Sequence, residues 1–448
     1  MFSQVDMTTN HTYCASRREA LLAAIPNNSV VVVSAAPEVI RSRDTDFPFR
    51  QDSDFYYLTH FPEPEALLLL QKDELGQCSQ QLFCRDKDEL AEVWHGRRFG
   101  HAQASQLFGI VATSLSGLDE ALLQALNQKT YLYVAQGLYQ ALDEKLFAVL
   151  ANLRAQPKKG YVAPTHLVDL RPVIAELRLF KDEFEVKLMQ SAGLISAKAH
   201  QRAMLRCTSL QFEYQLEAEI RHEFAMQGAR HCAYNTIVGA GENGCILHYT
   251  DNDAALKNGD LVLIDAGCEL QGYAADITRT FPINGKFTAE QAAIYQLVLD
   301  AQLAACAQVK PGNTSKDTLD AAVAVLTLGL LELGILQGDF ESLVAELACK
   351  KYFIHGLGHW LGLDVHDVGA YKIAGKERPF APGMVLTIEP GLYIPKGSAC
   401  DEKWWGIAVR IEDDLLVIKD GHLNLTDTAP KTISAIEALM AQGEKIAN

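Results

Sequence analysis

Two acidic residues, Asp265 and Asp276, lie within one apolar stretch of the chain, LVLIDAGCELQGYAADITRTFP at positions 261–282. The pattern of apolar residues around them predicts two strands of a hairpin. A turn centred between Leu270 and Gln271 would place the two aspartates directly opposite each other. Their Cβ atoms would then be about 5 Å apart, and two bare carboxylates at that distance repel each other and are costly to bury. A partner must therefore neutralise them.

Three kinds of partner would neutralise the pair: a metal cation, a shared proton, or an arginine, for which Arg279 is the obvious candidate. The hairpin by itself does not decide between these alternatives. The decision depends on potential ligands farther along the chain.

Further potential metal ligands follow downstream. The segment HGLGHWLGLDVHD carries three histidines, His355, His359 and His366, and its glycines favour a loop or a frayed helix start. Glu389 ends the apolar strand of TIEPGLY, and Glu412 lies inside AVRIEDD, at positions where acidic side chains are rare unless they are paired. With the two aspartates, the chain thus offers four carboxylates and one imidazole, His359, and no thiolate.

This set of ligands indicates which metal ions suit the site. Oxygen-rich sets suit manganese, magnesium or calcium, and one imidazole shifts the preference toward manganese, cobalt, iron or zinc. Four carboxylates carry too much negative charge for one divalent ion. We therefore expect two ions that share bridging carboxylates, as in two-metal hydrolases.

Composition excludes several other classes of protein. The chain has 448 residues and a formal net charge of -16, which argues against binding to nucleic acid or to an anionic membrane surface. We expect no secretory signal in the polar start and no membrane span, because the most apolar run, from Ala321, is interrupted by Glu332. Ten cysteines without a C-x-x-C pair fit free thiols in a reducing cytoplasm.

The pattern of elements predicts an α/β (α+β) fold with two domains. Strands such as SVVVVS and ALLLLQK mix with helices in the first part, and long amphipathic helices beginning near Glu183 precede a strand-rich last third. We expect an N-terminal mixed α/β domain at 1–177 and a C-terminal domain at 178–448. One helix should begin directly after Thr288, which is a suitable N-cap.

With these residues identified, the sequence closely resembles aminopeptidase P, the Xaa-Pro aminopeptidase of the pita-bread metallopeptidases. The resemblance extends upstream through EVWHGRRFG and ELRLFK, and its main motifs follow in order from Asn235 to Asp414: NTIVGAGENGCILHYTDN, LVLIDAGCELQGYAADITRTFP, HGLGHWLGLDVHDVG, PGMVLTIEPGLY and GIAVRIEDD. It implies a C-terminal catalytic pita-bread domain. It also implies a cytoplasmic enzyme whose substrates are peptides with proline in second position, from which it removes the first residue.

The resemblance implies two manganese ions per subunit, with cobalt or zinc as other divalent metals that suit the site. Asp265 would bind one ion in bidentate fashion, and Asp276 and Glu412 would bridge both ions. His359 and Glu389 would complete the other ion. A hydroxide bridging the two ions would be the nucleophile, and Glu389 would handle its proton.

Other residues would act on the substrate, again by resemblance. His248 and His366 would contact the scissile carbonyl oxygen and stabilise the developing oxyanion. His355 would line the pocket for the proline ring, and Tyr393 and Arg410 would position these groups.

The resemblance also concerns the assembly. In the family, a tryptophan of the N-terminal domain reaches the active site of a neighbouring subunit, which implies this role for Trp94 in EVWHGRRFG and a homo-oligomer, with a tetramer favoured. One departure follows HDVG, where the family has an arginine that gates the substrate channel. Here AYKIAGKERPF offers Lys376 and Arg378, and a lysine lacks the planar fork of an arginine.

Two rival functions stay open at this point. A prolidase cuts Xaa-Pro dipeptides with the same ligands, and loops around the pocket, rather than the ligands, decide between the two activities. A metal-free binding protein on the same fold is the rival from another class. Five intact ligand positions speak against that second rival.

Overall fold

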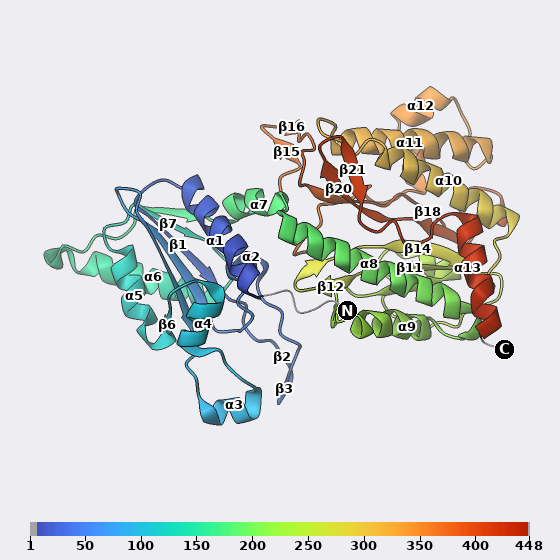
Figure 1. The fold of residues 1–448 in the computed structure, drawn as a ribbon. Helices are drawn as coiled ribbons and strands as arrows, with labels where there is room; N and C mark the ends of the chain where they lie inside the picture. The colour runs from blue at the N-terminus through green and yellow to red at the C-terminus, as the bar shows by residue number, and fades with distance from the viewer. Residues whose placement is uncertain (1–6, 447–448) are drawn as a thin grey trace. The chain divides into compact units, whose positions relative to one another are not determined.

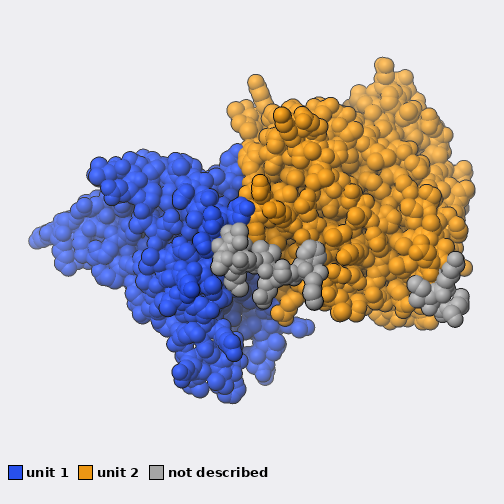
Figure 2. Space-filling view, viewed as in Figure 1, with its two compact units in different colours: residues 1–178 blue, residues 179–448 orange. Residues whose placement is uncertain are grey.

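The computed structural model of the protein describes residues 7–446, so that the first six residues of the polar start lie outside the described part. The chain separates into two compact units, unit 1 at Met1–Arg178 and unit 2 at Leu179–Asn448 (Figure 2). Each unit has a buried hydrophobic core of its own, as separate domains do.

Unit 1 is built on one mixed six-stranded sheet of order β6-β5-β4-β1-β7-β8 (Figure 1). Strands β1, β4 and β5 pair antiparallel, and the other neighbours pair parallel. The predicted strands SVVVVS and ALLLLQK are confirmed as β1 and β4. The strands are β1 Ser29–Ser34, β2 Ile40–Ser42, β3 Thr45–Asp46, β4 Leu67–Lys72, β5 Cys78–Cys84, β6 Ala112–Ser114, β7 Tyr131–Val134 and β8 His166–Asp169. The helices are α1 Met7–Ala24, α2 Ser53–Thr59, α3 Glu89–His95, α4 Gly100–Phe108, α5 Leu118–Leu126, α6 Gln140–Ala155 and α7 Arg171–Leu179, which ends at the first residue of unit 2.

Unit 2 holds short strands between two groups of helices (Figure 1). Its helices are α8 Glu183–Arg206, α9 Glu213–Met226, α10 Ala289–Cys306, α11 Ser315–Glu332, α12 Phe340–Ala345 and α13 Ile433–Ile446. Its strands are β9 His231–Cys232, β10 Ile237–Ala240, β11 Leu261–Asp265, β12 Cys268–Leu270, β13 Tyr273–Ala274, β14 Thr278–Pro282, β15 Lys372–Ile373, β16 Lys376–Glu377, β17 Val385–Ile388, β18 Gly391–Ile394, β19 Ile407–Arg410, β20 Asp413–Ile418 and β21 Gly421–Asn424. Helix α8 contacts β12 and β13, α9 contacts β10, and α10 contacts β17, β18 and β19. This mixture of helices and sheets confirms the predicted α/β class.

Two long helices of unit 2, α8 and α10, begin at side-chain caps. Asp182 caps α8 in a capping box with Glu185, because its carboxylate accepts from backbone N–H groups of the first turn. Thr288 caps α10 in the same way with Gln291, which confirms the helix start predicted at this threonine. Among the described helices, none combines the length and the apolar character needed to cross a membrane.

The hairpin that carries Asp265 and Asp276 has a different register from the predicted one. Its turn is formed by Gln271 and Gly272, whose φ angles of 50° and 85° are those of a type I′ turn. Asp265 therefore pairs with Thr278, and the prediction that it lies opposite Asp276 is wrong. Because the turn centre moves by one residue, the partner changes by two positions. Both aspartates consequently stay on the same face of the hairpin.

Candidate metal centre

The five predicted metal ligands lie at or beside the ends of strands in unit 2. Asp265 is the last residue of β11, Glu389 directly follows β17, and Glu412 lies between β19 and β20. Asp276 precedes β14, and His359 lies in the loop before β15, where the glycine-rich segment forms no helix. All five residues line one cavity of about 590 Å³.

Three of these side chains form the tightest group. One potential ligand atom from each of Asp276, His359 and Glu412 lies within 4.8 Å of the others. His359 Nε2 is 3.5 Å from Asp276 Oδ2 and 3.6 Å from Glu389 Oε1. A divalent ion that binds nitrogen and oxygen at about 2.0–2.2 Å fits between atoms at such separations. The residues present therefore fit a metal ion.

His359 is held so that one ring nitrogen faces the carboxylates. Its Nδ1 lies 3.0 Å from the backbone oxygen of Trp360, and a proton on Nδ1 leaves Nε2 as the free ligand atom. The backbone N–H of His359 donates to Thr387 Oγ1 at 3.1 Å, and that hydroxyl donates to Glu389 Oε1 at 3.4 Å. One threonine of β17 therefore connects two of the predicted ligands.

Tyr234 contacts both aspartates, and the sequence pattern did not predict it. Its hydroxyl oxygen lies 2.6 Å from Asp265 Oδ1 and 2.5 Å from Asp276 Oδ1. A hydroxyl donates only one hydrogen, so the second contact needs a proton on a carboxyl group. Burial and then the charge of Asp265 raise the pKa of Asp276, which favours that proton.

The crowding of carboxylates raises the proton affinity of the whole cluster. Burial raises the pKa of Glu389 to about 7, although the charges of His359 and Arg410 oppose the shift. Burial and then the charge of Asp276 also raise the pKa of Glu412 well above its usual value. Burial disfavours the charged form of His359, yet the hydrogen bond with Asp276 and the charges of Asp276 and Glu389 together outweigh burial and raise the pKa to about 9. Such a cluster is stable only with bound cations, either protons or metal ions.

A chain of polar contacts runs from Asp265 along the cavity. Arg410 donates from Nη2 to Asp265 Oδ2 at 2.5 Å and from Nη1 to the Tyr393 hydroxyl at 2.8 Å. The Tyr393 hydroxyl lies 2.9 Å from His355 Nε2, and His355 Nδ1 lies 2.7 Å from the backbone oxygen of Gly356. Burial lowers the pKa of His355 to about 3, so the ring is neutral and its Nε2 accepts from Tyr393.

Arg279 is not the partner of the two aspartates. Its guanidinium is fully buried and pairs with Asp413, with 2.6 Å between Nη2 and Oδ1. Successive residues of a strand face opposite sides of the sheet, and Thr278 faces the carboxylate of Glu412. Arg279 therefore faces away from the cavity, and the arginine that neutralises Asp265 is Arg410.

The remaining predicted substrate residues divide into two groups. His248 and His366 line the same cavity as the carboxylates, and the His366 ring centre is 4.1 Å from that of His359. Arg378 is buried with its guanidinium 5.6 Å from the ring of Phe180, and Lys376 lies exposed in β16. Neither of these two cations belongs to the described residues that line the cavity.

Trp94 lies in unit 1, on the short helix α3. Its side chain is 77% exposed, and Leu90 and Val93 of the same helix are exposed as well. The helix buries none of its residues in the described part of the chain. Exposed apolar side chains gathered in this way mark a candidate contact surface.

Two family models match the chain. The model described as metallopeptidase family M24 matches residues 187–419, within unit 2. The model described as aminopeptidase P, N-terminal domain, matches residues 14–133, within unit 1. The M24 match includes all five predicted ligands.

Relatives with known names cover nearly the whole chain. The chain is 47% identical over 430 residues to the Xaa-Pro aminopeptidase of Escherichia coli (strain K12), which covers 96% of this chain and 97% of that one. The structure of proline aminopeptidase P II from Yersinia pestis superimposes with a TM-score of 0.93 at 49% identity, covering 96% of this chain and 99% of that one. The zinc-substituted structure of E. coli aminopeptidase P in complex with product gives a TM-score of 0.94 at 46% identity, with coverage of 97% and 98%. These matches confirm the predicted order of an N-terminal domain and a pita-bread domain.

Proposed function

Because the chain belongs to metallopeptidase family M24, as an enzyme of the Xaa-Pro aminopeptidase group, we propose that two divalent ions in its cavity serve to release the first residue of peptides with proline in second position. Proline requires a dedicated enzyme, since its tertiary amide lacks an N–H and its ring fixes φ. The observation that carries the proposal is the cavity itself, which gathers four carboxylates and four histidines.

We propose manganese as the metal, with two ions per subunit and with cobalt or zinc as possible replacements. Asp265 would hold one ion, Asp276 and Glu412 would bridge both, and His359 and Glu389 would hold the other. Four carboxylates balance two divalent ions, whereas a single ion would leave excess buried negative charge. When bound, such ions lower the pKa of water to near neutrality and so supply hydroxide as the nucleophile. The zinc-substituted E. coli structure supports a site that accepts more than one metal.

Glu389 is proposed to move the proton of the reaction. Its Oε1 lies 3.6 Å from His359 Nε2 and its Oε2 lies 3.7 Å from His355 Nδ1, so it stands between the ligand group and the proposed proline pocket. In the metal-free cavity burial raises the pKa of Glu389 to about 7, so this carboxyl group binds a proton more readily than an exposed one. We infer that Glu389 takes a proton from the attacking water and delivers it to the proline nitrogen as the amide bond breaks.

The histidines are proposed to act on the substrate. His248 and His366 line the cavity, and they would donate hydrogen bonds to the scissile carbonyl oxygen as negative charge develops on it. His355 would form a wall of the proline pocket. Tyr393 and Arg410 would position His355 and the carboxylate of Asp265 relative to each other, which the chain of hydrogen bonds between them supports.

We also propose a cytoplasmic homotetramer with domains at 1–177 and 178–448. In it, Trp94 of one subunit would reach the active site of a neighbour. The exposure of Trp94, Leu90 and Val93 supports a surface that another chain covers.

The proposed function is tested by product analysis on three peptides: a Xaa-Pro-Yaa tripeptide, its N-acetylated form and the matching Xaa-Ala-Yaa tripeptide. We expect free Xaa from the unblocked proline peptide, no cleavage of the acetylated form and very slow cleavage of the alanine form. A chelator should abolish the reaction and manganese should restore it best. Activity that a chelator leaves unchanged, in protein that elemental analysis finds free of divalent metal, would contradict the proposal.

A further inference from the structure

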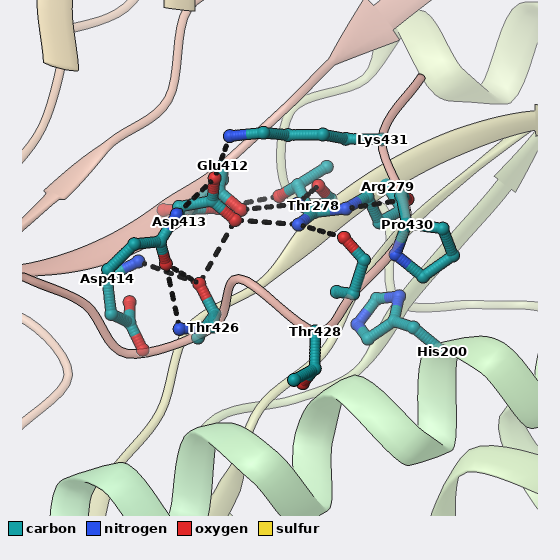
Figure 3. A network of polar contacts seen from close by, with 12 residues as sticks. His200, Thr278, Arg279, Glu412, Asp413, Asp414, Thr426, Thr428, Pro430 and Lys431 are labelled. Atoms are coloured by element: carbon teal, nitrogen blue, oxygen red, sulfur yellow. Dashed lines mark hydrogen bonds and ion pairs between the residues drawn. The ribbon is translucent and has the colours of Figure 1, made fainter. Parts of the chain in front are cut away.

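A cluster of charged residues packs against the backbone that carries Glu412, a residue that lines the cavity (Figure 3). It consists of Arg279 in β14, Asp413 at the start of β20 and Lys431 just before α13. The side chains of Arg279 and Asp413 are fully buried, and that of Lys431 is 20% exposed. Charges of this kind are costly to desolvate. Their presence next to a metal-ligand candidate therefore suggests a role beyond packing.

Asp413 holds the two cations of this cluster together. Its Oδ1 accepts from Arg279 Nη2 at 2.6 Å, and its Oδ2 accepts from Lys431 Nζ at 2.6 Å. The Asp413 carboxylate also accepts hydrogen bonds from three neutral side chains, those of Gln302, Asn424 and Thr426. A carboxylate bonded on both oxygens has one orientation, so the guanidinium that it anchors is fixed as well.

Arg279 connects this cluster to the segments that carry the predicted ligands. Its Nη1 donates to the backbone oxygens of Thr278, at 2.9 Å, and Glu412, at 2.5 Å. The backbone oxygen of Thr278 also accepts from the backbone N–H of Glu412 at 3.1 Å. The guanidinium thus links two backbone segments at their junction, the hairpin at Thr278 and the chain at Glu412, as Figure 3 shows.

The cavity side of the same junction carries the Glu412 carboxylate. Thr278 Oγ1 donates to Glu412 Oε2 at 2.6 Å. Side chains of successive residues in extended chain point to opposite sides, so fixing Asp413 on one side sets the direction of Glu412 on the other. A shift of the backbone here would move Glu412 away from Asp276 and His359, whose ligand atoms lie within 4.8 Å of its own.

We propose that Arg279, anchored by Asp413, is a positioning residue that holds the Glu412 backbone where metal binding requires it. This inference rests on the proposed role of Glu412 as a metal ligand. Lys431 is the matched control, because it is a second cation on the same carboxylate. In the described part of the chain its ammonium group bonds Asp413 and Gln302, at 2.6 and 3.0 Å, and not the backbone of Glu412.

The test is manganese binding, measured by titration calorimetry on the full chain after removal of metal by a chelator. Arg279→Lys keeps the positive charge but cannot offer a planar fork to the four carbonyl oxygens of Thr278, Glu412, Ala429 and Pro430 and to the carboxylate of Asp413. We expect its Kd for manganese to rise about tenfold or more, since losing an outer partner of a metal ligand costs about 10–100-fold in affinity. Lys431→Met should bind manganese as tightly as the unsubstituted protein, although it also removes a partly buried positive charge.

Equal manganese affinity in Arg279→Lys and the unsubstituted protein would overturn the inference, and so would equal losses in Arg279→Lys and Lys431→Met. If the unsubstituted protein binds no manganese, the proposed metal site itself is contradicted. Circular dichroism of each metal-free variant checks that it is folded at the temperature of the titration. If Arg279→Lys does not fold, Asp413→Asn replaces it, because this near-isosteric change removes the anchor of Arg279. Asp413→Asn should then bind manganese more weakly than Lys431→Met, and equal affinity would overturn the inference.

Discussion

Glu412 shows at the scale of one residue why this cavity requires cations. Its side chain is only 2% exposed, and burial together with the charge of Asp276 raises its pKa well above the usual range. Without a counter-charge, the cluster can lower its energy only by taking up protons. A divalent ion offers the alternative, because it lets the carboxylates stay charged while buried.

The first prediction concerns Glu412→Gln, which keeps the size of the side chain and removes its charge. We expect loss of at least one metal ion per subunit and a kcat/KM lower by at least about 100-fold, since even an outer partner of a ligand contributes up to about 100-fold. The fold should survive, because the helices and the core of unit 1 do not depend on this carboxylate. Elemental analysis, circular dichroism and steady-state kinetics measure the three effects. A near-normal kcat would show that Glu412 does not bridge two ions.

The second prediction concerns His200 of α8, whose Nε2 lies 3.0 Å from the backbone oxygen of Ala266. Burial lowers the pKa of His200 from 6.5 to about 4, so the folded protein keeps this ring neutral. The unfolded chain gains a proton near pH 6.5 and the folded chain does not. His200 therefore lowers the free energy of unfolding as pH falls from about 6.5 to about 4. The loss is about 1.4 kcal/mol per pH unit.

Calorimetric unfolding of metal-free protein across this pH range tests the effect. His200→Gln should flatten the dependence of Tm on pH in that window compared with the unsubstituted protein. The same slope in both proteins would show that His200 does not contribute to acid sensitivity.

The sequence identifies single candidate ligands more readily than their neighbours. Acidic residues are rare in apolar strands, so the four carboxylates could be predicted from their surroundings alone. Tyr234 could not, because a tyrosine in a loop carries no comparable signal and meets the aspartates only after the chain folds back. Proximity along the chain favours Arg279 as the partner of the aspartates, but its side chain lies on the opposite side of the strand and pairs with Asp413. Arg410 contacts Asp265 instead.

At the scale of elements, the hairpin β11–β14 separates what a sequence predicts from what it leaves undecided. Apolar stretches predict the strands, and Thr288 predicts the start of α10. The register depends on the turn, where Gln271 adopts a positive φ of 50°. Glycine, asparagine and aspartate are the residues that usually indicate such a turn, so a glutamine at its first position does not predict it.

The third prediction concerns the loop that carries His359. A Cβ on Gly358 would lie 2.0 Å from the backbone oxygen of Thr387 in β17, whereas a Cβ on Gly356 would meet nothing within 4 Å. Gly358→Ala should therefore displace the loop and weaken manganese binding by about tenfold or more. Gly356→Ala is the matched control and should bind manganese normally. Equal affinities in calorimetry would show that the close approach of Gly358 to β17 does not position His359.

At the scale of the whole molecule, the fold class and the order of its parts could be predicted, because periodicity and motifs extend over most of the chain. The family models and the E. coli relative confirm both. The assembly could not be predicted from periodicity, since the pattern of one chain does not indicate which partner covers an exposed side chain such as Trp94.

The fourth prediction concerns Trp94→Ala. If the indole closes a neighbouring subunit's site, its removal should lower kcat/KM roughly tenfold, equal to about 1.4 kcal/mol of lost contact, and leave the metal content unchanged. Light scattering after size exclusion, combined with kinetics, measures assembly and activity together. A monomer with unchanged kinetics on short peptides would refute this role.

The most direct measurement is kcat/KM, with added manganese, for a Xaa-Pro dipeptide and a Xaa-Pro-Yaa tripeptide that share the same Xaa–Pro bond. An aminopeptidase holds the free amine of the first residue near the metals and leaves the far side of the proline pocket open. A prolidase closes that side with groups that bind the proline carboxylate. We predict that the tripeptide and longer peptides are cut much faster than the dipeptide, with release of Xaa. A strong preference for the dipeptide would contradict the proposed activity and favour a prolidase.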